Sequence, residues 1–522
     1  MQDNKDVDTS ATVDNPDYTA GQDNVQVWGL DVHNPVFAIA ATLVVAFVVF
    51  TLVFQEQAAE YFTALRPWLT TKFHWVFSIS ANIFVLLTVG LIFSPWAKVR
   101  IGGKSATPEY SYPSWFAMMF AAGVGIGLMF YGVLEPVNNY LNPPLGFTTD
   151  DPQVRQVAMA ATIFHWALHP WAIYAVVGLA LAIFSYNKGL PLTIRSGFYP
   201  LLGDRVWGWP GHIIDVLAVL ATLFGIATTL GYGAEQASAG LTYLYGVPGG
   251  ATTKVVLIVI ITLIALVSVL RGLDGGVKIL SEINLVLAGG LCLFIIAVGA
   301  TWNILGNFFS HIVSYLRYLP ELSNWVGRED THYYHGWTTF YWAWWIAWSP
   351  FVGMFIARIS RGRTVREFLT CALLVPSLAS TLWMTAFGDS AIVQNLEAGH
   401  EGVFDAVRNS QVELSLFKFL ELLPMADVLS ALAILLIVIF FVTSMDSGSL
   451  VIDIITAGGK IDAPIPQRAF WCCFEGLVAI ALLLGGGLAA LQALALASAF
   501  PFTLLMLLLC YSIVQGLRSE PR

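Results

Sequence analysis

Residues 340–351 have the sequence Phe340-Tyr-Trp-Ala-Trp-Trp-Ile-Ala-Trp-Ser-Pro-Phe351, which holds four tryptophans and no charged side chain. The surrounding stretch Trp337–Ala357 is also free of charge, and it is long enough to cross a bilayer as a helix, for which about 20 apolar residues suffice. Membrane tryptophans usually form belts at the two interfaces, but this run is too dense for that alone and has a proline inside it. Trp345 and Trp348 are three residues apart and share one helix face. The stretch therefore predicts a membrane-spanning helix with an aromatic face.

The whole chain has the composition of a protein embedded in a membrane. Of its 522 residues, 57% are hydrophobic and only 11% are charged, which is too little charge to cover soluble domains. With the N-terminus in the cytoplasm, 17 of the 25 Lys and Arg fall on the inner side, as the positive-inside rule requires. The predicted fold class is all-α integral membrane with both termini cytoplasmic. The twelve predicted spans are Pro35–Phe54, His74–Ser94, Pro113–Leu134, Val157–Tyr186, Ile213–Leu241, Thr253–Leu270, Ile279–Trp302, Trp337–Ala357, Phe368–Phe387, Met425–Ser444, Ala469–Leu484 and Leu491–Gly516.

Two segments outside these spans have their own character. Residues 1–33 carry seven Asp against one Lys, which predicts a disordered polar tail without the features of a signal peptide and argues against a nucleic-acid partner. The segment Asn303–Leu319 contains His311 and Arg317 and is expected to form an interfacial amphipathic helix. The five cysteines lie in or beside apolar stretches without a CxxC pair, which argues against a disulfide framework or a zinc site.

The third span contains Ala121-Ala-Gly-Val-Gly-Ile-Gly127, with glycines at every second position. Each Gly costs about 0.8–1 kcal/mol relative to Ala inside a helix. One interpretation is an unwound stretch that exposes backbone amides and carbonyls to a cavity. The other is close helix packing through Gly123 and Gly127, and the sequence alone leaves both open.

The fourth span holds a second aromatic run, Phe164-His-Trp-Ala-Leu-His-Pro-Trp-Ala-Ile-Tyr174. Trp171 and Tyr174 share one face, as Trp345 and Trp348 do in the eighth span. Two such faces would form a box of rings, which binds a dehydrated cation with about 0.5–2 kcal/mol per ring. A trimethylammonium group cannot donate hydrogen bonds, so ring faces suit it.

Four further polar residues at membrane depth are candidates for a role. His165 and His169 are four apart, but Trp166 stands where a metalloprotease motif has Glu, and no third ligand is near, so interior hydrogen bonding is expected. The hydroxyls of Thr443 and Ser444 suit a sodium ion, or else bond back to their own helix.

Glu235 lies inside the apolar fifth span. An acidic residue at that depth is a functional candidate, and the alternative is that it faces water near the helix end.

Two long motifs together resemble the betaine/choline/carnitine transporter family. They are Gly123-Val-Gly-Ile-Gly-Leu-Met-Phe-Tyr-Gly-Val-Leu-Glu-Pro136 and Trp344-Trp-Ile-Ala-Trp-Ser-Pro-Phe-Val-Gly-Met-Phe-Ile-Ala-Arg-Ile-Ser-Arg-Gly-Arg363, and the likeness extends from about Pro113 to Leu505. The resemblance implies a homotrimer and twelve transmembrane helices, two of which precede a LeuT-type core of ten built as a 5+5 inverted repeat. It divides the chain into a tail (1–33), two peripheral spans (34–95), a first repeat half (96–302), an interfacial helix and loop (303–336), a second half (337–516) and a short C-terminal tail (517–522).

Carried over residue by residue, the resemblance implies two sites. The substrate would be bound by the aromatic side chains and the glycine backbone of Trp166, Trp171, Tyr174, Trp344, Trp345, Trp348, Phe351, Gly123, Gly125 and Gly127. Sodium would be bound by the carbonyls of Ala121, Val124 and Phe440 with the hydroxyls of Thr443 and Ser444. A second sodium site, with Thr222 and Phe351, is in doubt, because Ile226 stands where the sodium-coupled betaine carriers have a second threonine. The alternative is a second site that uses Thr228 or Thr229 instead.

The resemblance implies a transporter rather than an enzyme, with no cofactor beyond Na⁺ as the coupling ion. We expect uptake of an onium zwitterion such as glycine betaine by Na⁺ symport and alternating access, across the inner membrane of a bacterium. A zwitterion is favoured over choline, because a bare cation would favour a carboxylate in the pocket. Some proton-coupled choline carriers of the family have Asp at the position of Gly127, which offers no carboxylate here. Proton-coupled choline uptake, uptake of dimethylsulfoniopropionate or ectoine, and sodium-independent carnitine-type exchange remain open alternatives.

Overall fold

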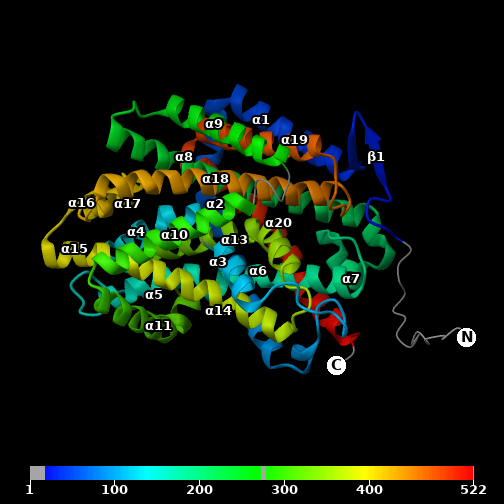
Figure 1. Cartoon of the computed structure of the whole chain (residues 1–522), viewed down its shortest axis with the longest axis horizontal. Helices are drawn as coiled ribbons and strands as arrows, with labels where there is room; N and C mark the ends of the chain where they lie inside the picture. The colour runs from blue at the N-terminus through cyan, green and yellow to red at the C-terminus, as the bar shows by residue number, and fades with distance from the viewer. Residues whose placement is uncertain (1–17, 124, 272–277, 521–522) are drawn as a thin grey trace, which may run out of the picture.

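The computed structural model describes residues 18–123, 125–271 and 278–520, and it is built almost entirely from helices that run side by side along one axis (Figure 1). Between the helices lie short 3₁₀ and π turns, and the strands β1 (Asn24–Val27) and β2 (Leu30–His33) form a hairpin. The helices are α1 (Val36–Val53), α2 (Gln55–Phe93), α3 (Tyr112–Gly123), α4 (Ile126–Leu141), α5 (Val154–Trp166), α6 (Leu168–Leu181), α7 (Tyr199–Leu202), α8 (Trp209–Tyr245), α9 (Ala251–Arg271), α10 (Lys278–Val298), α11 (Thr301–Ser323), α12 (Thr331–Tyr333), α13 (Thr339–Arg358), α14 (Val365–Met384), α15 (Ser390–Ala398), α16 (Gly402–Arg408), α17 (Ser415–Leu420), α18 (Ala426–Thr456), α19 (Ile465–Leu484) and α20 (Gly487–Arg518).

Within the described residues, ten helical segments are long and apolar enough to cross a membrane, which confirms an all-α membrane protein. They correspond to ten of the twelve predicted spans. The other two are α3 with α4, and α13. Neither α3 nor α4 is long enough alone because the backbone between them is extended at Gly125, and α13 is less apolar because of its tryptophans.

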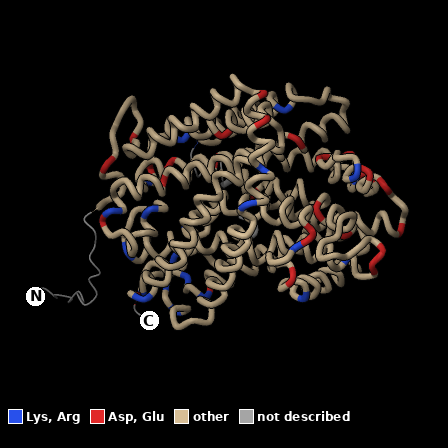
Figure 2. Tube along the Cα trace, turned by 180° about the vertical axis from the view of Figure 1, so that it is seen from behind, with Lys and Arg blue, Asp and Glu red and all other residues tan. Residues whose placement is uncertain are grey.

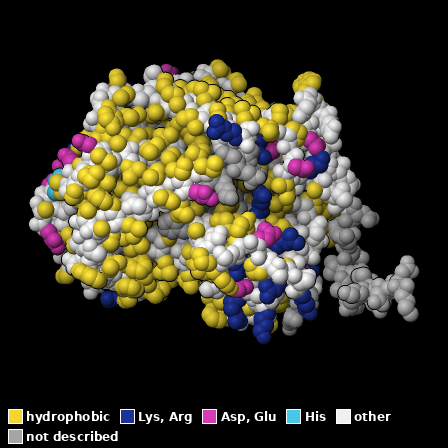
Figure 3. Space-filling view, in the orientation of Figure 1, with side chains coloured by type: hydrophobic (Ala, Val, Ile, Leu, Met, Phe, Trp, Pro, Cys, Tyr) yellow, Lys and Arg dark blue, Asp and Glu magenta, His cyan; other side chains and the backbone are white. Residues whose placement is uncertain are grey.

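The helices differ sharply in how much of their apolar surface the protein itself covers. Only 28% of the apolar window of α1 and of α9 is buried, against 94% for the segment formed by α5 and α6. The outer helices therefore present hydrophobic side chains outward, and such side chains cover the middle of the face in Figure 3. Because lipid tails are as apolar as these side chains, this surface suits a bilayer, and the buried helices form the core.

The N-terminal segment is folded where the sequence suggested disorder. In the β1–β2 hairpin Asn24 pairs with His33, and the hairpin docks on the loop between α18 and α19. The Asn24 side chain donates to the Ala457 carbonyl at 2.9 Å, and Lys460 Nζ donates to Asp31 Oδ2 at 2.5 Å. The prediction of a disordered tail over residues 1–33 is thus wrong for residues 24–33, while residues 1–17 lie outside the described part of the chain. The cause is tertiary docking, which composition does not reveal.

The predicted amphipathic helix Asn303–Leu319 is found as α11, which is not among the candidate spans. Phe309 and Val313 are exposed on it, whereas His311 is buried and lies 3.0 Å from Thr385 Oγ1. The helix therefore has one face toward the protein and one apolar face outward, as an interfacial helix requires.

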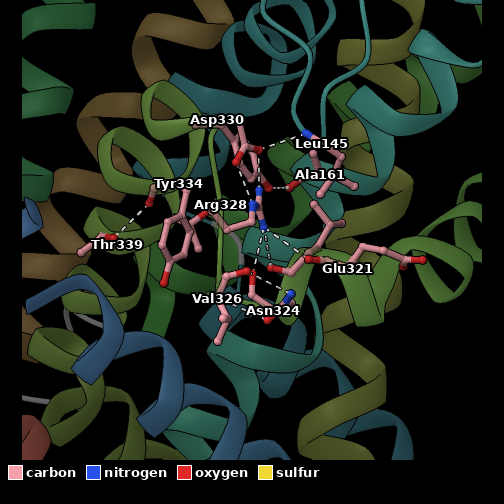
Figure 4. A network of polar contacts seen from close by, with 12 residues as sticks. Leu145, Ala161, Glu321, Asn324, Val326, Arg328, Asp330, Tyr334 and Thr339 are labelled. Atoms are coloured by element: carbon pink, nitrogen blue, oxygen red, sulfur yellow. Dashed lines mark hydrogen bonds and ion pairs between the residues drawn. The ribbon is translucent and has the colours of Figure 1, made fainter.

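An ion pair orders the loop that follows α11 (Figure 4). Arg328 makes a bidentate pair with Asp330, with Nε–Oδ1 and Nη2–Oδ2 distances of 2.7 and 2.5 Å, and its Nη1 donates to carbonyls at the end of α11. Although burial alone would raise the pKa of Asp330, hydrogen bonds from Arg328 and from the Leu145 backbone lower it. Through the bond from the Leu145 backbone to Asp330, the pair connects this loop to the segment that follows α4. Asp330 itself directly precedes the residues that lead into α13.

Charges are unevenly distributed along the helix axis. Lys and Arg gather at the end where β1 and the C-terminal end of α20 lie, and Asp and Glu prevail at the opposite end (Figures 1 and 2). The two ends of the described chain therefore lie on the same, basic side.

Candidate functional site

A cavity of about 940 Å³ opens into the centre of the helix bundle. Most of its wall comes from α3, α4, α5, α6, α13 and α18, which are the helices that carry the predicted motifs, and residues of α8, α10 and α14 complete it. Toward one end the wall includes Glu109, Arg358 and Arg361, and Arg361 Nη1 lies 3.7 Å from Glu109 Oε1. The predicted site residues that line the cavity are Ala121, Gly125, Gly127, Trp166, Trp171, Tyr174, Trp344, Trp345, Trp348, Phe351, Phe440, Thr443 and Ser444.

The aromatic side chains predicted to share a chamber do so. Trp345 is at the centre of the group: its ring centroid lies 4.9 Å from that of Trp344, 5.0 Å from Trp166 and 6.1 Å from Tyr174. Trp171 stands edge-on to Tyr174 at 5.3 Å. Rings from α5, α6 and α13 thus border one space, and a cation that enters it would meet several ring faces together.

Three of the indole rings are fixed by hydrogen bonds on their outer edge. The Nε1 groups of Trp166, Trp345 and Trp344 donate to Glu135 Oε2 at 2.7 Å, to the His165 carbonyl at 2.9 Å and to Thr229 Oγ1 at 3.2 Å. The Nε1 of Trp348 is buried without a hydrogen-bond partner among the described residues. The rings are therefore held in place before any ligand arrives, which lowers the entropy lost on binding.

Both interpretations of the glycine motif have support in the geometry. Gly125 is extended (φ −164°, ψ −167°), separates α3 from α4 and lines the cavity, as an unwound stretch would. Gly127 allows close packing, because a Cβ built there would lie 2.8 Å from Trp166 Cη2 and 3.4 Å from Trp344 Cη2. The missing side chain at 127 is thus what lets two rings of the chamber approach α4. Gly123 is the last residue of α3, and its part in the site stays a prediction.

The predicted sodium ligands share the same cavity with the rings. Thr443 Oγ1 donates back to the carbonyls of Ile439 and Phe440 at 3.0 and 3.1 Å, so its lone pairs remain free to accept a cation. Ser444, Phe440 and Ala121 line the cavity beside it. Oxygen ligands of this kind suit a hard cation, while the predicted ligand Val124 lies outside the described residues.

Two of the predicted residues lie elsewhere. Thr222 donates to the Ala218 carbonyl at 2.8 Å within α8 and is not part of the cavity wall, and Ile226 packs against Gly448 of α18. Glu235 also does not line the cavity, and its Oε2 pairs with Lys254 of α9 at 2.5 Å. Its side chain is 14% exposed, and its partner Lys254 lies in the first turn of α9, outside the chamber.

The sequence interpretation missed the group that organises the chamber from behind, the carboxylate of Glu135. This fully buried side chain accepts the Trp166 indole, accepts Tyr341 Oη at 2.5 Å and lies 2.5 Å from His165 Nδ1. His165 Nε2 in turn lies 2.9 Å from Thr338 Oγ1, so this histidine has the interior hydrogen-bonding role that was expected. Glu135 follows directly on the third predicted span, and an acidic residue at that position was the available signal.

An aromatic chamber enclosed by membrane helices, with cation-accepting oxygens on the same wall, is the arrangement of a membrane transporter for a small solute. A model of the betaine/carnitine/choline transporter family matches residues 35–522, and the chain belongs to this family.

Several curated relatives are similar over nearly the full length of this chain. A glycine betaine/proline/choline transporter of Vibrio parahaemolyticus is 56% identical, over 97% of this chain and 94% of that protein. Glycine betaine transporter 1 of the same species is 51% identical over 98% of both chains. A glycine betaine transporter of Acinetobacter baylyi is 43% identical, over 93% of this chain and 74% of its own length. The family and these relatives are transporters, not enzymes.

Proposed function

We propose that this protein imports glycine betaine, or a closely similar onium zwitterion, by Na⁺ symport through alternating access. The observation that carries the proposal is the shared cavity: the rings of Trp166, Tyr174, Trp345 and their neighbours and the hydroxyls of Thr443 and Ser444 line one space. A cation-binding box beside an oxygen site for Na⁺ supports a mechanism in which substrate and ion bind together.

The surroundings of the rings favour a zwitterion over a bare cation. Glu135 is the carboxylate that is hydrogen-bonded to the rings, but it does not line the cavity and already interacts with Trp166, Tyr341 and His165. Two carboxylates do line the cavity, Glu109, which lies 3.7 Å from Arg361, and Glu282, and neither is hydrogen-bonded to a ring of the chamber. A substrate that brings its own carboxylate leaves no net charge to be balanced in the low-dielectric interior. The relatives named for glycine betaine, proline and choline agree with this choice in part, since the first two are zwitterions.

One sodium ion supplies enough driving force for strong accumulation. Its movement across ~100 mV contributes about 2.3 kcal/mol, and a tenfold gradient adds about 1.4 kcal/mol. Together these correspond to accumulation on the order of 500-fold. A second ion is not needed, which fits the absence of Thr222 from the cavity wall.

We further propose twelve spans, with α3–α4 as the third and α13 as the eighth, a LeuT-type 5+5 repeat, and a homotrimer in the bacterial inner membrane with cytoplasmic termini. This orientation is supported by the Lys and Arg side chains that gather at the end of the molecule where β1 and the C-terminal end of α20 lie (Figure 2). An even number of spans places both ends on one side. In this orientation the cavity is open toward the cytoplasm, because Arg358 and Arg361 lie in its wall at the inner end.

The proposal is tested by uptake of labelled glycine betaine into proteoliposomes, with an inward Na⁺ gradient or with K⁺ in its place. We expect accumulation only with Na⁺. Glu235→Gln serves as a matched control, because Glu235 lies outside the cavity. Equal uptake with and without Na⁺ would refute the coupling, and no saturable uptake of any onium compound would refute the substrate class.

A further inference from the structure

The β1–β2 hairpin has its polar and apolar faces reversed relative to a hairpin that covers a protein core. In the antiparallel register Val25 pairs with Val32 and Val27 pairs with Leu30, and directly paired side chains lie on the same face of a hairpin. One face, the outer face, therefore consists of these four aliphatic side chains. The other face is polar and consists of Asn24, Gln26, Asp31 and His33.

The polar face is the one that contacts the protein. Asp31 accepts a hydrogen bond from Lys460 Nζ at 2.5 Å, and its backbone N–H donates to Gln467 Oε1 at 3.2 Å. Asp31 is buried, whereas Val25 and Val27 of the outer face are each 41% exposed. In water an antiparallel sheet turns its apolar face to the core and its polar face to the solvent. The hairpin is therefore built in the reverse of the way that water favours.

The tip of the hairpin carries a tryptophan that its own turn does not require. Trp28 and Gly29 are the two central residues of the turn, with φ of +50° and +81°. A two-residue turn with positive φ at both positions favours Asn-Gly, and a bulky side chain at the first position is strained. The Trp28 side chain is 97% exposed, so it adds nothing to the packing of the hairpin. A large exposed ring at a strained position points to a partner outside the chain.

The hairpin lies at the depth where the chain enters the bilayer. β2 ends at His33, and α1 begins at Val36 as a candidate span whose apolar window is only 28% buried. The headgroup layer begins where such a span ends, about 15 Å from the midplane of the bilayer. The hairpin lies across the ends of the long helices and reaches to the side on which α1 and α9 lie (Figure 1). Hydrophobic side chains cover its protruding tip (Figure 3).

We propose that the outer face and Trp28 dock on the bilayer itself, at the boundary between the headgroups and acyl chains of the leaflet from which α1 enters the membrane. This boundary is where membrane tryptophans gather, because the indole offers apolar surface to the acyl chains and an N–H to the headgroups. The aliphatic side chains of the outer face leave water in the same step. The docking goes beyond the proposed function, since it depends on neither the substrate nor the ion.

Two other occupants suit the outer face less well. Each partner in a stable protein–protein interface buries about 800 Å², which is more than four aliphatic side chains and one indole offer. Residues 1–17 carry five Asp and no aromatic side chain, so their chemistry does not match an apolar face. The bilayer surface, in contrast, continues the outward apolar surface of α1 directly.

Spin-label accessibility tests the docking on the full-length protein in vesicles of phosphatidylcholine and phosphatidylglycerol. A nitroxide label at Val25→Cys is compared with one at Gln26→Cys, the next residue, which is also exposed but belongs to the polar face. Oxygen concentrates in lipid, whereas a nickel chelate stays in water. We expect oxygen to reach the label at 25 and the chelate to be excluded from it, while the chelate reaches the label at 26. The parent protein with its five native cysteines gives the background signal. Equal access of the chelate to both labels would overturn the proposal.

A second variant separates the role of the ring from the folding of the hairpin. Trp28→Asn gives the turn its favoured Asn-Gly sequence, so the hairpin should persist, which hydrogen exchange of residues 24–33 measures. The label at Val25→Cys should nevertheless lose its shielding from the chelate, because the indole that holds the tip is gone. Full shielding in Trp28→Asn, with the hairpin intact, would show that the ring is not the anchor and would contradict the proposal.

The other occupants would give different signals in the same experiment. If deletion of residues 2–17 exposes the label at Val25→Cys to the chelate, the N-terminal tail covers the outer face. If labels on different copies broaden each other's spectra, a second copy covers it. Either result overturns the docking on lipid. No uptake is measured, so failure of the proposed function would leave this test unaffected.

Discussion

Substitution of Gly127 by alanine tests whether the packing of two rings against α4 sets substrate affinity. The new Cβ would lie 2.8 Å from Trp166 Cη2, and 3.4 Å is the lower limit of an ordinary contact, so the ring or the helix must move by about 0.6 Å. Trp166 cannot rotate away freely, because its Nε1 is bonded to Glu135. Overpacking of this kind costs about 1–3 kcal/mol. If the displacement removes the ring from its place in the box, affinity should fall by about 5- to 150-fold.

Gly90→Ala in α2 is the control, because Gly90 is also helical but does not line the cavity. A Cβ at Gly90 would meet nothing within 4 Å. Affinity is measured by tryptophan fluorescence or calorimetry on the purified proteins, and expression and thermal stability are compared in parallel. Similar affinities for the two variants would show that the contact between Gly127 and Trp166 does not position the ring, and the account of the chamber would then be wrong.

Four further predictions follow from single side chains. Glu135→Gln keeps the size of the side chain but lacks the charge that Trp166, Tyr341 and His165 surround. Glycine betaine affinity should therefore fall more than about tenfold. An unchanged affinity would contradict the role of Glu135 in holding the rings. Trp348→Leu should lower affinity several-fold in the same binding assay while expression persists, because it removes a ring face. Thr443→Ala should raise the Na⁺ concentration for half-maximal uptake several-fold, and a wild-type sodium response would exclude the hydroxyl as a ligand. Burial beside Arg195 and His212 lowers the pKa of His33 to about 3. Docking of the hairpin should therefore be complete above about pH 6.5, and its free energy should weaken by about 1.4 kcal/mol per pH unit below that. Hydrogen exchange of residues 24–33 measures this, and exchange that does not accelerate at acidic pH beyond its intrinsic change would contradict the prediction.

The sequence predicted the helices well because a bilayer leaves few alternatives. A long uncharged stretch such as Trp337–Ala357 must bond its own backbone, and a helix is the way to do so. The ring faces were also predictable, since Trp345 and Trp348 are three residues apart on such a helix. That Trp345 and Trp166 meet at 5.0 Å depends on how α5 and α13 pack, and the family resemblance supplied that expectation rather than spacing.

What sequence reasoning missed depends on contacts between segments far apart in the chain. The three groups around Glu135 lie up to 206 residues away from it, and no local pattern relates them. The hairpin at residues 24–33 is likewise fixed by Lys460 and the Ala457 carbonyl, more than 400 residues away. Polar composition predicted disorder there because it describes what a segment does when nothing is available to bind it.

The hydrogen bonds of the rings bear on substrate selectivity. Trp166, Trp344 and Trp345 each donate their indole N–H to a protein acceptor, so these N–H groups are not available to a ligand. What the three indoles present to the cavity is ring surface, which attracts positive charge but makes only weak hydrogen-bond acceptors. A primary ammonium group enclosed by these three rings would give up hydrogen bonds to water that the rings do not replace, whereas a trimethylammonium group has none to lose. If the proposed function holds, we therefore expect these rings to favour methylated onium groups, because their N–H groups are already bonded to Glu135, Thr229 and the His165 carbonyl.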